Sequence, residues 1–311
     1  MKRLLLACTF IALALAAAWY GFPHLFKEPL VTANRAAAGL AEKEVTVDAH
    51  RIHYLDGGSG ETLVLLHGIF AEKDHWVDFA RPLTGSYRVL VPDLPGFGES
   101  SRLDSHSYSY DAQTERLKAL LDTLGIARAH LAGNSMGGTL AALFAMRYPE
   151  RVASVALIGA PHGIRSPKAS DMDKQIEAGK SPLVARDARE FQAMLSLVFA
   201  ERPFLPYPIL HAAEENAVRN ADSNLRLWHA QLKDRFLLDG QIGGLAARTL
   251  VLWGSGDQVF DASGAEVLKD RLKNAEVHVL PGIGHLPMME APKETAGMYA
   301  RFLARQTAAA H

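Results

Sequence analysis

The chain contains 311 residues, of which 49% are hydrophobic and 22% are charged, so it is long and apolar enough to bury a sizeable core. Its 33 Lys and Arg residues nearly balance its 34 Asp and Glu residues, which argues against a nucleic-acid-binding face and against a polybasic patch for acidic lipids. The single cysteine, Cys8, excludes an intramolecular disulfide and a cysteine-based metal site.

The first 26 residues have the pattern of a membrane anchor or a signal segment. Lys2 and Arg3 precede the uncharged run Leu4 to Phe22, whose length lies at the lower edge of a membrane-spanning helix and above a typical signal-peptide core. Trp19 and Tyr20 suit an interfacial position. We expect an uncleaved anchor with its basic end in the cytoplasm, which would place the rest of the chain on the periplasmic or lumenal side. Cleavage, giving a secreted or periplasmic protein, is the alternative.

A linker rich in small side chains is expected over residues 27–43, before the first strands. Glu44 to Val47 and Arg51 to Leu55 alternate polar and apolar residues, the pattern of two short antiparallel strands joined by a turn. Thr62 to Leu66 is a continuous apolar run, typical of a strand buried on both faces. Arg88 to Val91 is predicted to be the next strand, and an amphipathic helix follows it.

The stretch Leu131 to Gly138 contains the motif Gly-x-Ser-x-Gly, with Ser135 at its centre. It directly follows an apolar strand and directly precedes a helix-forming run from Thr139 to Tyr148. A serine on such a sharp strand-to-helix turn is held in a strained conformation that exposes its hydroxyl. Only small residues fit two positions to either side, as Gly133 and Gly137 do here. Ser135 is therefore the expected nucleophile.

Two backbone N–H groups are candidates for an oxyanion hole, which stabilises negative charge on a substrate oxygen. The turn places the Met136 N–H at the N-terminus of the following helix. The loop after the strand Thr62 to Leu66 should supply the second donor, for which the Ile69 N–H is the candidate. His67 lies beside this donor and is expected to order the loop rather than to act as a base. Phe70 is expected to contribute to substrate binding.

Strands that alternate with helices imply a parallel sheet covered on both faces, and residues 44–161 and 245–311 are expected to form this core. Between them, residues 162–244 show no strand pattern and are predicted to form a helical cap. Large apolar side chains recur there at helical spacing, at Phe191, Met194, Leu195, Val198 and Phe199. Most of them should pack against the core, and one or two unidentified cap residues should line a substrate channel.

Two candidate catalytic residues follow the last two predicted strands. Asp257 comes after one of them, and His285 comes after the other on a glycine-rich loop. The strands are Arg248 to Trp253 and Glu276 to Leu280. A serine hydroxyl is a poor nucleophile at neutral pH, so it needs a base, here His285, and an acid that orients the base, here Asp257. Asp261 and Glu290 are weaker candidates for the acid, because neither directly follows a strand.

The chain resembles the α/β-hydrolase superfamily over residues 45–303, and within it the membrane-anchored monoacylglycerol lipases and their bacterial lipase relatives. The segments that carry the resemblance surround the predicted site, and they are His67 to Asp74 with Trp76, Gly133 to Gly138, Phe199 to Pro208, Trp253-Gly254 with Asp257 to Val259, Asp261 to Ala265, and Gly284-His285. It implies an α/β-hydrolase fold with a mostly parallel eight-stranded sheet, helices on both faces and a helical cap inserted before the seventh strand. The order serine, acid, histidine agrees with that superfamily.

The candidate residues and the resemblance together predict a serine carboxylic-ester hydrolase that forms an acyl-enzyme on Ser135 and needs neither a cofactor nor a metal. The expected substrate is a small acyl ester or a lipid such as a monoacylglycerol, and the N-terminal segment provides the contact with a membrane. Two alternatives are a carbon–carbon bond hydrolase of the meta-cleavage product type and a non-catalytic ligand-binding α/β-hydrolase. Relatives with the first of these activities usually carry an arginine near the Trp-Gly pair, where Ser255 stands here.

Overall fold

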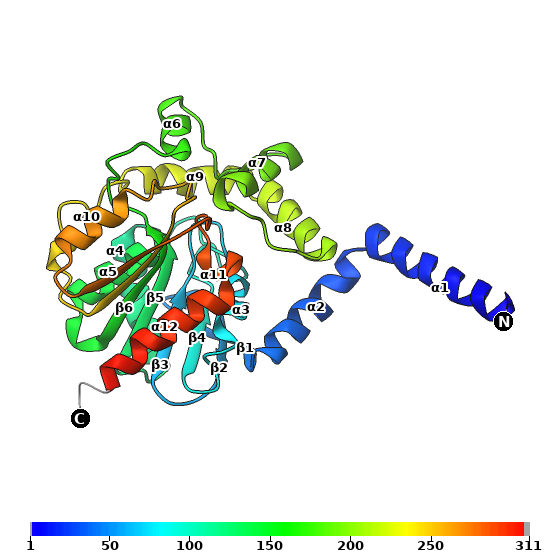
Figure 1. The fold of residues 1–311 in the computed structure, drawn as a ribbon, viewed down its shortest axis with the longest axis horizontal. Helices are drawn as coiled ribbons and strands as arrows, with labels where there is room; N and C mark the ends of the chain where they lie inside the picture. Colours follow the sequence, from blue (N-terminus) through cyan, green and yellow to red (C-terminus); the bar gives the residue numbers. More distant parts are fainter. Residues whose placement is uncertain (1, 308–311) are drawn as a thin grey trace.

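An eight-stranded sheet in the order β1-β2-β4-β3-β5-β6-β7-β8 forms the centre of the molecule (Figure 1). The computed structural model describes residues 2–307. β2 pairs antiparallel with β1 and β4, and the pairs from β4 through β8 are parallel. The strands are β1 (Leu40–Val47), β2 (His50–Gly57), β3 (Thr62–Leu66), β4 (Arg88–Pro92), β5 (Ala129–Ser135), β6 (Val152–Pro161), β7 (Thr249–Gly254) and β8 (Ala275–Leu280). This confirms the predicted α/β-hydrolase fold and its mostly parallel sheet.

The central strands are buried on both faces, as the continuous apolar runs predict. In β3, Leu63 and Leu65 pack into one large core cluster, whereas Val64 and Leu66 pack into the other. Side chains of α4, α5 and α10 belong to the cluster of Val64, and side chains of α3, α11 and α12 belong to the cluster of Leu63. These helices are α3 (Val77–Ala80), α4 (Tyr110–Thr123), α5 (Met136–Arg147), α10 (Gly264–Arg271), α11 (Pro287–Glu290) and α12 (Pro292–Thr307). Helices therefore cover both faces of the sheet.

Four helices of the described chain lie between β6 and β7 and gather above one end of the sheet (Figure 1). They are α6 (Asp171–Glu177), α7 (Ala188–Val198), α8 (Tyr207–Arg219) and α9 (Ala221–Leu232). The predicted amphipathic stripe lies on α7, where Phe191 and Leu195 are buried. The sequence did not predict α8 as a separate helix, because the proline-rich stretch Pro203 to Pro208 interrupts the pattern at its start and most of its side chains are partly exposed.

The N-terminal segment forms helix α1 (Lys2–Gly21), which projects away from the body (Figure 1). Residues Arg3–Gly21 have a mean hydropathy of 2.0 and are long and apolar enough to cross a membrane, a property that signal sequences share. At the end of α1 the ring of Tyr20 lies 4.9 Å from that of Tyr207, at the start of α8. The first helix thus ends against the cap.

The segment expected to be a linker, residues 27–43, is largely helical. Helix α2 (His24–Ala37) contains Pro29, a residue that normally disfavours a helix interior, and β1 begins at Leu40 instead of at Glu44. Tertiary packing outweighs the local signal, because α2 contacts α8 and β1 and carries the buried Arg35. The Arg35 guanidinium donates two hydrogen bonds to the Asp74 carboxylate, at 2.6 and 2.7 Å.

Candidate active site

Ser135 lies at the junction of β5 and α5 in a backbone conformation that side chains rarely adopt. Its φ and ψ angles are 52° and −118°, in the left-handed half of the map. Glycine is required at positions 133 and 137 because other backbone atoms lie close to both of them. A Cβ atom on Gly133 would lie 2.2 Å from the Gly137 carbonyl oxygen, and one on Gly137 would lie 2.2 Å from the Leu66 carbonyl oxygen. The sequence motif therefore builds the sharp turn that the spacing predicts.

The two expected oxyanion donors lie on either side of this serine. Met136 is the first residue of α5, where backbone N–H groups have no intrahelical acceptor. The Ile69 N–H makes no hydrogen bond to any part of the chain between residues 2 and 307. Its loop approaches the serine closely, since a Cβ on Gly68 would lie 3.2 Å from the Ser135 Cβ. Phe70 follows with φ of 58°, a second strained position in the same loop.

Hydrogen bonds fix both the side chain and the backbone of His285. Its Nδ1 lies 2.8 Å from Asp257 Oδ2, and the other Asp257 oxygen accepts the N–H groups of Val259 and Phe260 at 2.8 and 2.9 Å. The backbone N–H of His285 donates to the Val198 carbonyl of α7 at 3.0 Å. With its Nδ1 held by a carboxylate, the imidazole presents its Nε2 as the atom available for proton transfer.

The two weaker candidates for the acid, Glu290 and Asp261, accept hydrogen bonds from backbone N–H groups. Glu290 accepts hydrogen bonds from the backbone of Ala200, Glu201 and Gly284 at 3.0 to 3.1 Å, and so braces the loop that carries His285. Asp261 accepts the N–H of Ser263 at 2.9 Å. The carboxylate that the structure brings to His285 is therefore that of Asp257.

A cavity of about 190 Å³ contains both Ser135 and His285 in its lining, together with Ile69 and Phe70. Much of its wall is apolar and comes from the cap and from α11, with side chains Leu183, Phe191, Met194, Leu195, Val198, Phe199, Leu205, Leu210, Leu286 and Met289. More cap side chains line this cavity than the one or two that the sequence led us to expect. The arrangement exposes a serine hydroxyl and a histidine to an apolar space large enough for part of an acyl chain.

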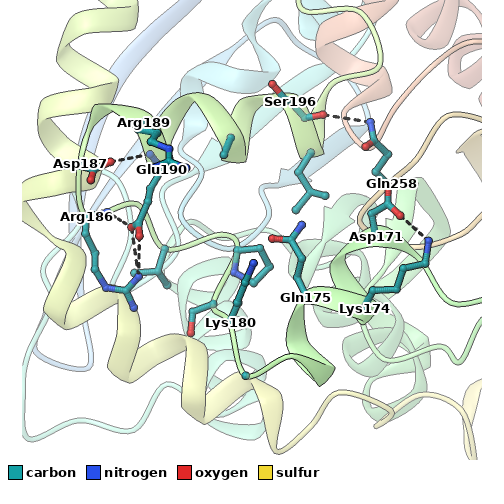
Figure 2. Close-up of a pocket in the computed structure, with 16 residues that line it drawn as sticks. Asp171, Lys174, Gln175, Lys180, Arg186, Asp187, Arg189, Glu190, Ser196 and Gln258 are labelled. Carbon is teal, nitrogen blue, oxygen red and sulfur yellow. Dashed lines mark hydrogen bonds and ion pairs between the residues drawn. The ribbon is translucent and has the colours of Figure 1, made fainter.

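A larger hollow of about 860 Å³ lies between α6 and α7, away from Ser135 (Figure 2). Its charged side chains largely pair with one another, as Lys174 does with Asp171 at 2.7 Å and Arg186 with Glu190 at 3.3 Å. These groups are exposed, so the hollow is a solvated surface of the cap, and it lacks the apolar wall of the smaller cavity.

His67 orders the loop that carries Ile69, as expected from its position. Its Nε2 accepts the N–H of Leu94 at 2.9 Å, which leaves the proton on Nδ1 to be donated to the Gly68 carbonyl at 2.7 Å. Burial lowers the pKa of this fully enclosed imidazole, so it stays neutral at physiological pH.

A charge cluster of Arg35, Lys73, Asp74, Asp93 and Glu99 lies just after the same loop, around the short helix η1 (Lys73–Trp76), and its members Arg35, Lys73 and Asp93 are buried. Lys73 and Asp93 are both fully buried, and the Lys73 ammonium lies 2.9 Å from the Asp93 carboxylate. Asp93 also accepts the backbone N–H groups of Lys73 and Glu99 at 2.6 and 2.9 Å. Burial alone would lower the pKa of Lys73, but Asp93 and Glu99 outweigh it and raise that pKa. The cluster therefore joins α2 to the loop that carries Ile69 through ion pairs.

Near the cluster, Glu42, His53 and Glu99 offer ligand atoms within 4.8 Å of one another. Arg35 already pairs with Glu42, and Lys73 already pairs with Glu99. Both carboxylates are thus neutralised by basic side chains of the protein itself.

Glu72 contributes a carboxyl group to the wall of the cavity. Burial and the neighbouring carboxylates Asp93 and Asp74 raise its pKa from 4.5 to about 7. The folded state then holds this proton more tightly than the unfolded state does. The stabilisation is fully present below the ordinary pKa and is lost as the pH rises through the folded-state pKa.

We therefore expect the melting temperature of the wild type to fall between about pH 5 and about pH 8, and we expect this fall to be smaller in the Glu72→Gln variant. Glu177, an exposed glutamate of α6, supplies the control variant Glu177→Gln, whose pH dependence should match that of the wild type. Thermal unfolding at several pH values provides the measurement. Parallel curves for Glu72→Gln and wild type would contradict the assignment of the titration to Glu72.

Sequence reasoning missed several groups at this site because their partners are distant in the chain. The Asn134 side chain donates to the His285 carbonyl at 2.9 Å and so links the serine turn to the histidine loop. His162 lies near Ser135, with its N–H 3.2 Å from the serine carbonyl and its Nδ1 2.9 Å from the Tyr110 hydroxyl. Burial lowers the pKa of His162 to about 4, which keeps it uncharged. Only the dipeptide Pro161-His162 after a strand could have drawn attention to it.

The fold and the site together define an α/β hydrolase. A model of the α/β hydrolase fold family matches residues 61–292, and the chain belongs to this family. It is 31% identical over 283 residues to Lipase 1 of Psychrobacter immobilis, covering 88% of each chain. It is 29% identical to monoacylglycerol lipase ABHD6 of Homo sapiens, covering 79% of this chain and 76% of the relative. The crystal structure of a membrane phospholipase A described as a bacterial virulence factor superposes with a TM-score of 0.89 at 40% identity, covering 99% of both chains.

Proposed function

We propose that this protein is a membrane-associated serine hydrolase that cleaves carboxylic esters of lipids through an acyl-enzyme on Ser135. The observation that carries the proposal is that Ser135 and His285 line one cavity, in which His285 is oriented by Asp257 at 2.8 Å. The lipase relatives and the apolar wall of the cavity support a lipid substrate.

In the proposed mechanism, Ser135 Oγ attacks the ester carbonyl carbon while His285 Nε2 takes the hydroxyl proton. The carbon–oxygen bond to the alcohol then breaks, and His285 gives that proton to the departing alkoxide. Water attacks the acyl group, His285 takes one of its protons, and the acyl–serine bond breaks as the proton returns to Ser135. Asp257 stabilises the charged imidazole throughout without accepting the proton.

The N–H groups of Ile69 and Met136 are proposed to bind the negatively charged oxygen of each tetrahedral intermediate. The loss of one such donor typically lowers the rate by about two to three powers of ten. Both donors are backbone groups, so their positions depend on the conformation of the loop and of the turn. The strained φ angles of Phe70 and Ser135 agree with this role, because strained backbone is common where geometry serves catalysis.

Helix α1 is proposed to hold the catalytic body at a membrane, with that body on the periplasmic or lumenal side. The apolar helix and the similarity to a membrane phospholipase A support membrane association. The positive residues at the start of the helix, Lys2 and Arg3, favour the stated orientation, because basic flanks are retained on the cytoplasmic side. A protein cleaved after α1 would carry the same catalytic body into the periplasm or outside the cell.

The proposal is tested by hydrolysis of p-nitrophenyl esters from acetate to palmitate by the full-length chain in a nonionic detergent. We expect a maximum at medium or long acyl chains, because the wall of the cavity is apolar. A fluorophosphonate probe should label the same preparation, with the modified peptide containing Ser135. A folded protein that neither hydrolyses any ester nor reacts with the probe would instead be a non-catalytic binding module.

A carbon–carbon bond hydrolase is the less supported alternative. The residue after Trp253-Gly254 is Ser255, whose hydroxyl accepts the N–H of Gly282 at 2.9 Å, instead of an arginine that could contact an acidic ring-cleavage product. Turnover of a meta-cleavage product in the absence of esterase activity would reverse this preference.

A further inference from the structure

Arg102 is the only lysine or arginine among the described residues that line the cavity of Ser135. It lies in the loop between β4 and α4, and its guanidinium is held from both the core and the cap. Its Nε donates to the Gly96 carbonyl at 2.7 Å, and its Nη1 donates to Asn224 Oδ1 at 3.0 Å and to the Ser223 hydroxyl. A long, flexible side chain is thus fixed in one position at the wall of the cavity.

The charge of Arg102 has no carboxylate partner within 4.0 Å in the part of the chain that the structure describes. All three of its acceptors are neutral, and its Nη2 has no acceptor among residues 2–307. Burial lowers the pKa of Arg102, and Asp104, whose charge opposes this, is 3.4 Å from another arginine, Arg226. Arg35, the buried arginine of α2, is paired by contrast with carboxylates. An arginine keeps its charge under such conditions, so the cavity contains an unneutralised cation with a free donor.

Two aromatic contacts connect this cation with the proposed oxyanion loop. The Arg102 guanidinium lies 6.0 Å from the centre of the Phe97 ring, which lies 6.3 Å from the ring of Phe70. Phe70 directly follows Ile69. The acidic side chain of the wall, Glu72, is influenced by burial and then by Asp93, Asp74, Lys73 and Lys27, and it forms no ion pair with Arg102 among residues 2–307. Arg102 therefore lines the same cavity as Ser135 and is linked to the loop of Ile69 through Phe97 and Phe70.

We propose that Arg102 binds the phosphate of a glycerophospholipid whose acyl ester is cleaved at Ser135. This inference rests on the proposed ester hydrolase function and adds a polar subsite to it. A fixed guanidinium with a free Nη2 matches a phosphate oxygen, and such charge-assisted hydrogen bonds are stronger than neutral ones. Among lipid esters, those with a phosphodiester carry the complementary charge, whereas a monoacylglycerol leaves Arg102 without a partner. Arg102 is thus a specificity residue that favours phospholipid over neutral lipid.

The test compares the full-length protein with Arg102→Met and Arg102→Lys on two substrates with the same acyl chain, a lysophosphatidylglycerol and a monoacylglycerol. The readout is the ratio of kcat/KM for the phospholipid to kcat/KM for the neutral lipid. We expect Arg102→Met to lower this ratio by about tenfold to a hundredfold, mainly through KM, as is typical for the loss of one charged hydrogen bond. The ratio for Arg102→Lys should lie between the ratio for the wild type and the ratio for Arg102→Met. The control is Arg202→Met, which removes an exposed cap arginine whose hydrogen-bond partner is the neutral side chain of Gln192, and it should leave the ratio at the wild-type value.

A purely structural role for Arg102, which bridges core and cap, would lower both kcat/KM values by the same factor and would overturn the proposal. Binding of decyl phosphate and of decanol, measured by calorimetry in a nonionic detergent, does not require turnover and tests Arg102 even if ester hydrolysis fails. We expect decyl phosphate to bind the wild type at least about tenfold more tightly than decanol does, and this advantage to disappear in Arg102→Met. Equal affinities in the wild type would overturn the proposal. Inorganic phosphate that binds as tightly as decyl phosphate would identify a site for free phosphate and would also overturn it.

Discussion

Replacement of Ser135 by alanine is expected to lower kcat on a p-nitrophenyl ester by about 10⁴- to 10⁶-fold, because no other group can form the acyl-enzyme. The substitution removes a single oxygen atom and keeps a side chain at the strained turn, so the fold should persist. Rates measured beside a melting curve would separate lost chemistry from lost structure. The binding of a non-hydrolysable lipid should be retained.

The matched control is Ser196→Ala on α7, since the Ser196 hydroxyl lies on the cap and donates to a backbone carbonyl within its own helix. It should retain wild-type activity. Near-full esterase activity in Ser135→Ala would remove Ser135 from its proposed role, and with it the proposed roles of His285 and Asp257.

Replacement of Lys73 by methionine is expected to cost about 3–5 kcal/mol of stability, because it leaves a buried carboxylate without its counter-charge. Asp93 is fully buried and would keep only the N–H donors of residue 73 and of Glu99. Methionine has nearly the length of lysine, so the loss reports charge more than volume. Thermal or urea unfolding of the detergent-solubilised full chain measures it.

The control for this variant is Lys269→Met, which removes the ammonium of an exposed pair with Glu266 at 3.5 Å. Such pairs contribute about 0–1 kcal/mol, so this variant should unfold nearly as the wild type does. Equal stability losses in the two lysine variants would mean that the Lys73–Asp93 pair is no more important than a surface ion pair.

The sheet and the candidate site were predictable because their signals are local. An apolar run such as Thr62 to Leu66 must be covered on both faces, and only a strand-to-helix turn requires glycine at both 133 and 137. Asp257 and His285 could be found because each follows a recognisable strand. Their mutual hydrogen bond then follows from the parallel arrangement of β7 and β8, which brings the two strand ends together.

The features that the sequence did not reveal depend on contacts between distant segments. Helix α2 contains a proline and a mixed surface, and its stability depends on Asp74, which lies 39 positions after Arg35. In the sequence, Lys73 resembles an ordinary surface lysine, because only the fold places Asp93 and Glu99 next to its ammonium group. The same holds for Arg102, whose cap partners Ser223 and Asn224 lie more than a hundred positions away. The hydrophobic periodicity of a single segment does not predict such pairings between distant segments.

The backbone hydrogen bond from His285 to Val198 couples the position of α7 to that of the proposed catalytic base. A displacement of α7 away from the body would break this bond and remove one of the hydrogen bonds that hold the histidine loop. If substrate entered by such a movement, the base would be loosened, and closure of the cap over a bound acyl chain would restore its position. We expect this coupling to favour acylation of the serine in the closed state, whereas release of the acyl group requires water to reach the acyl-enzyme.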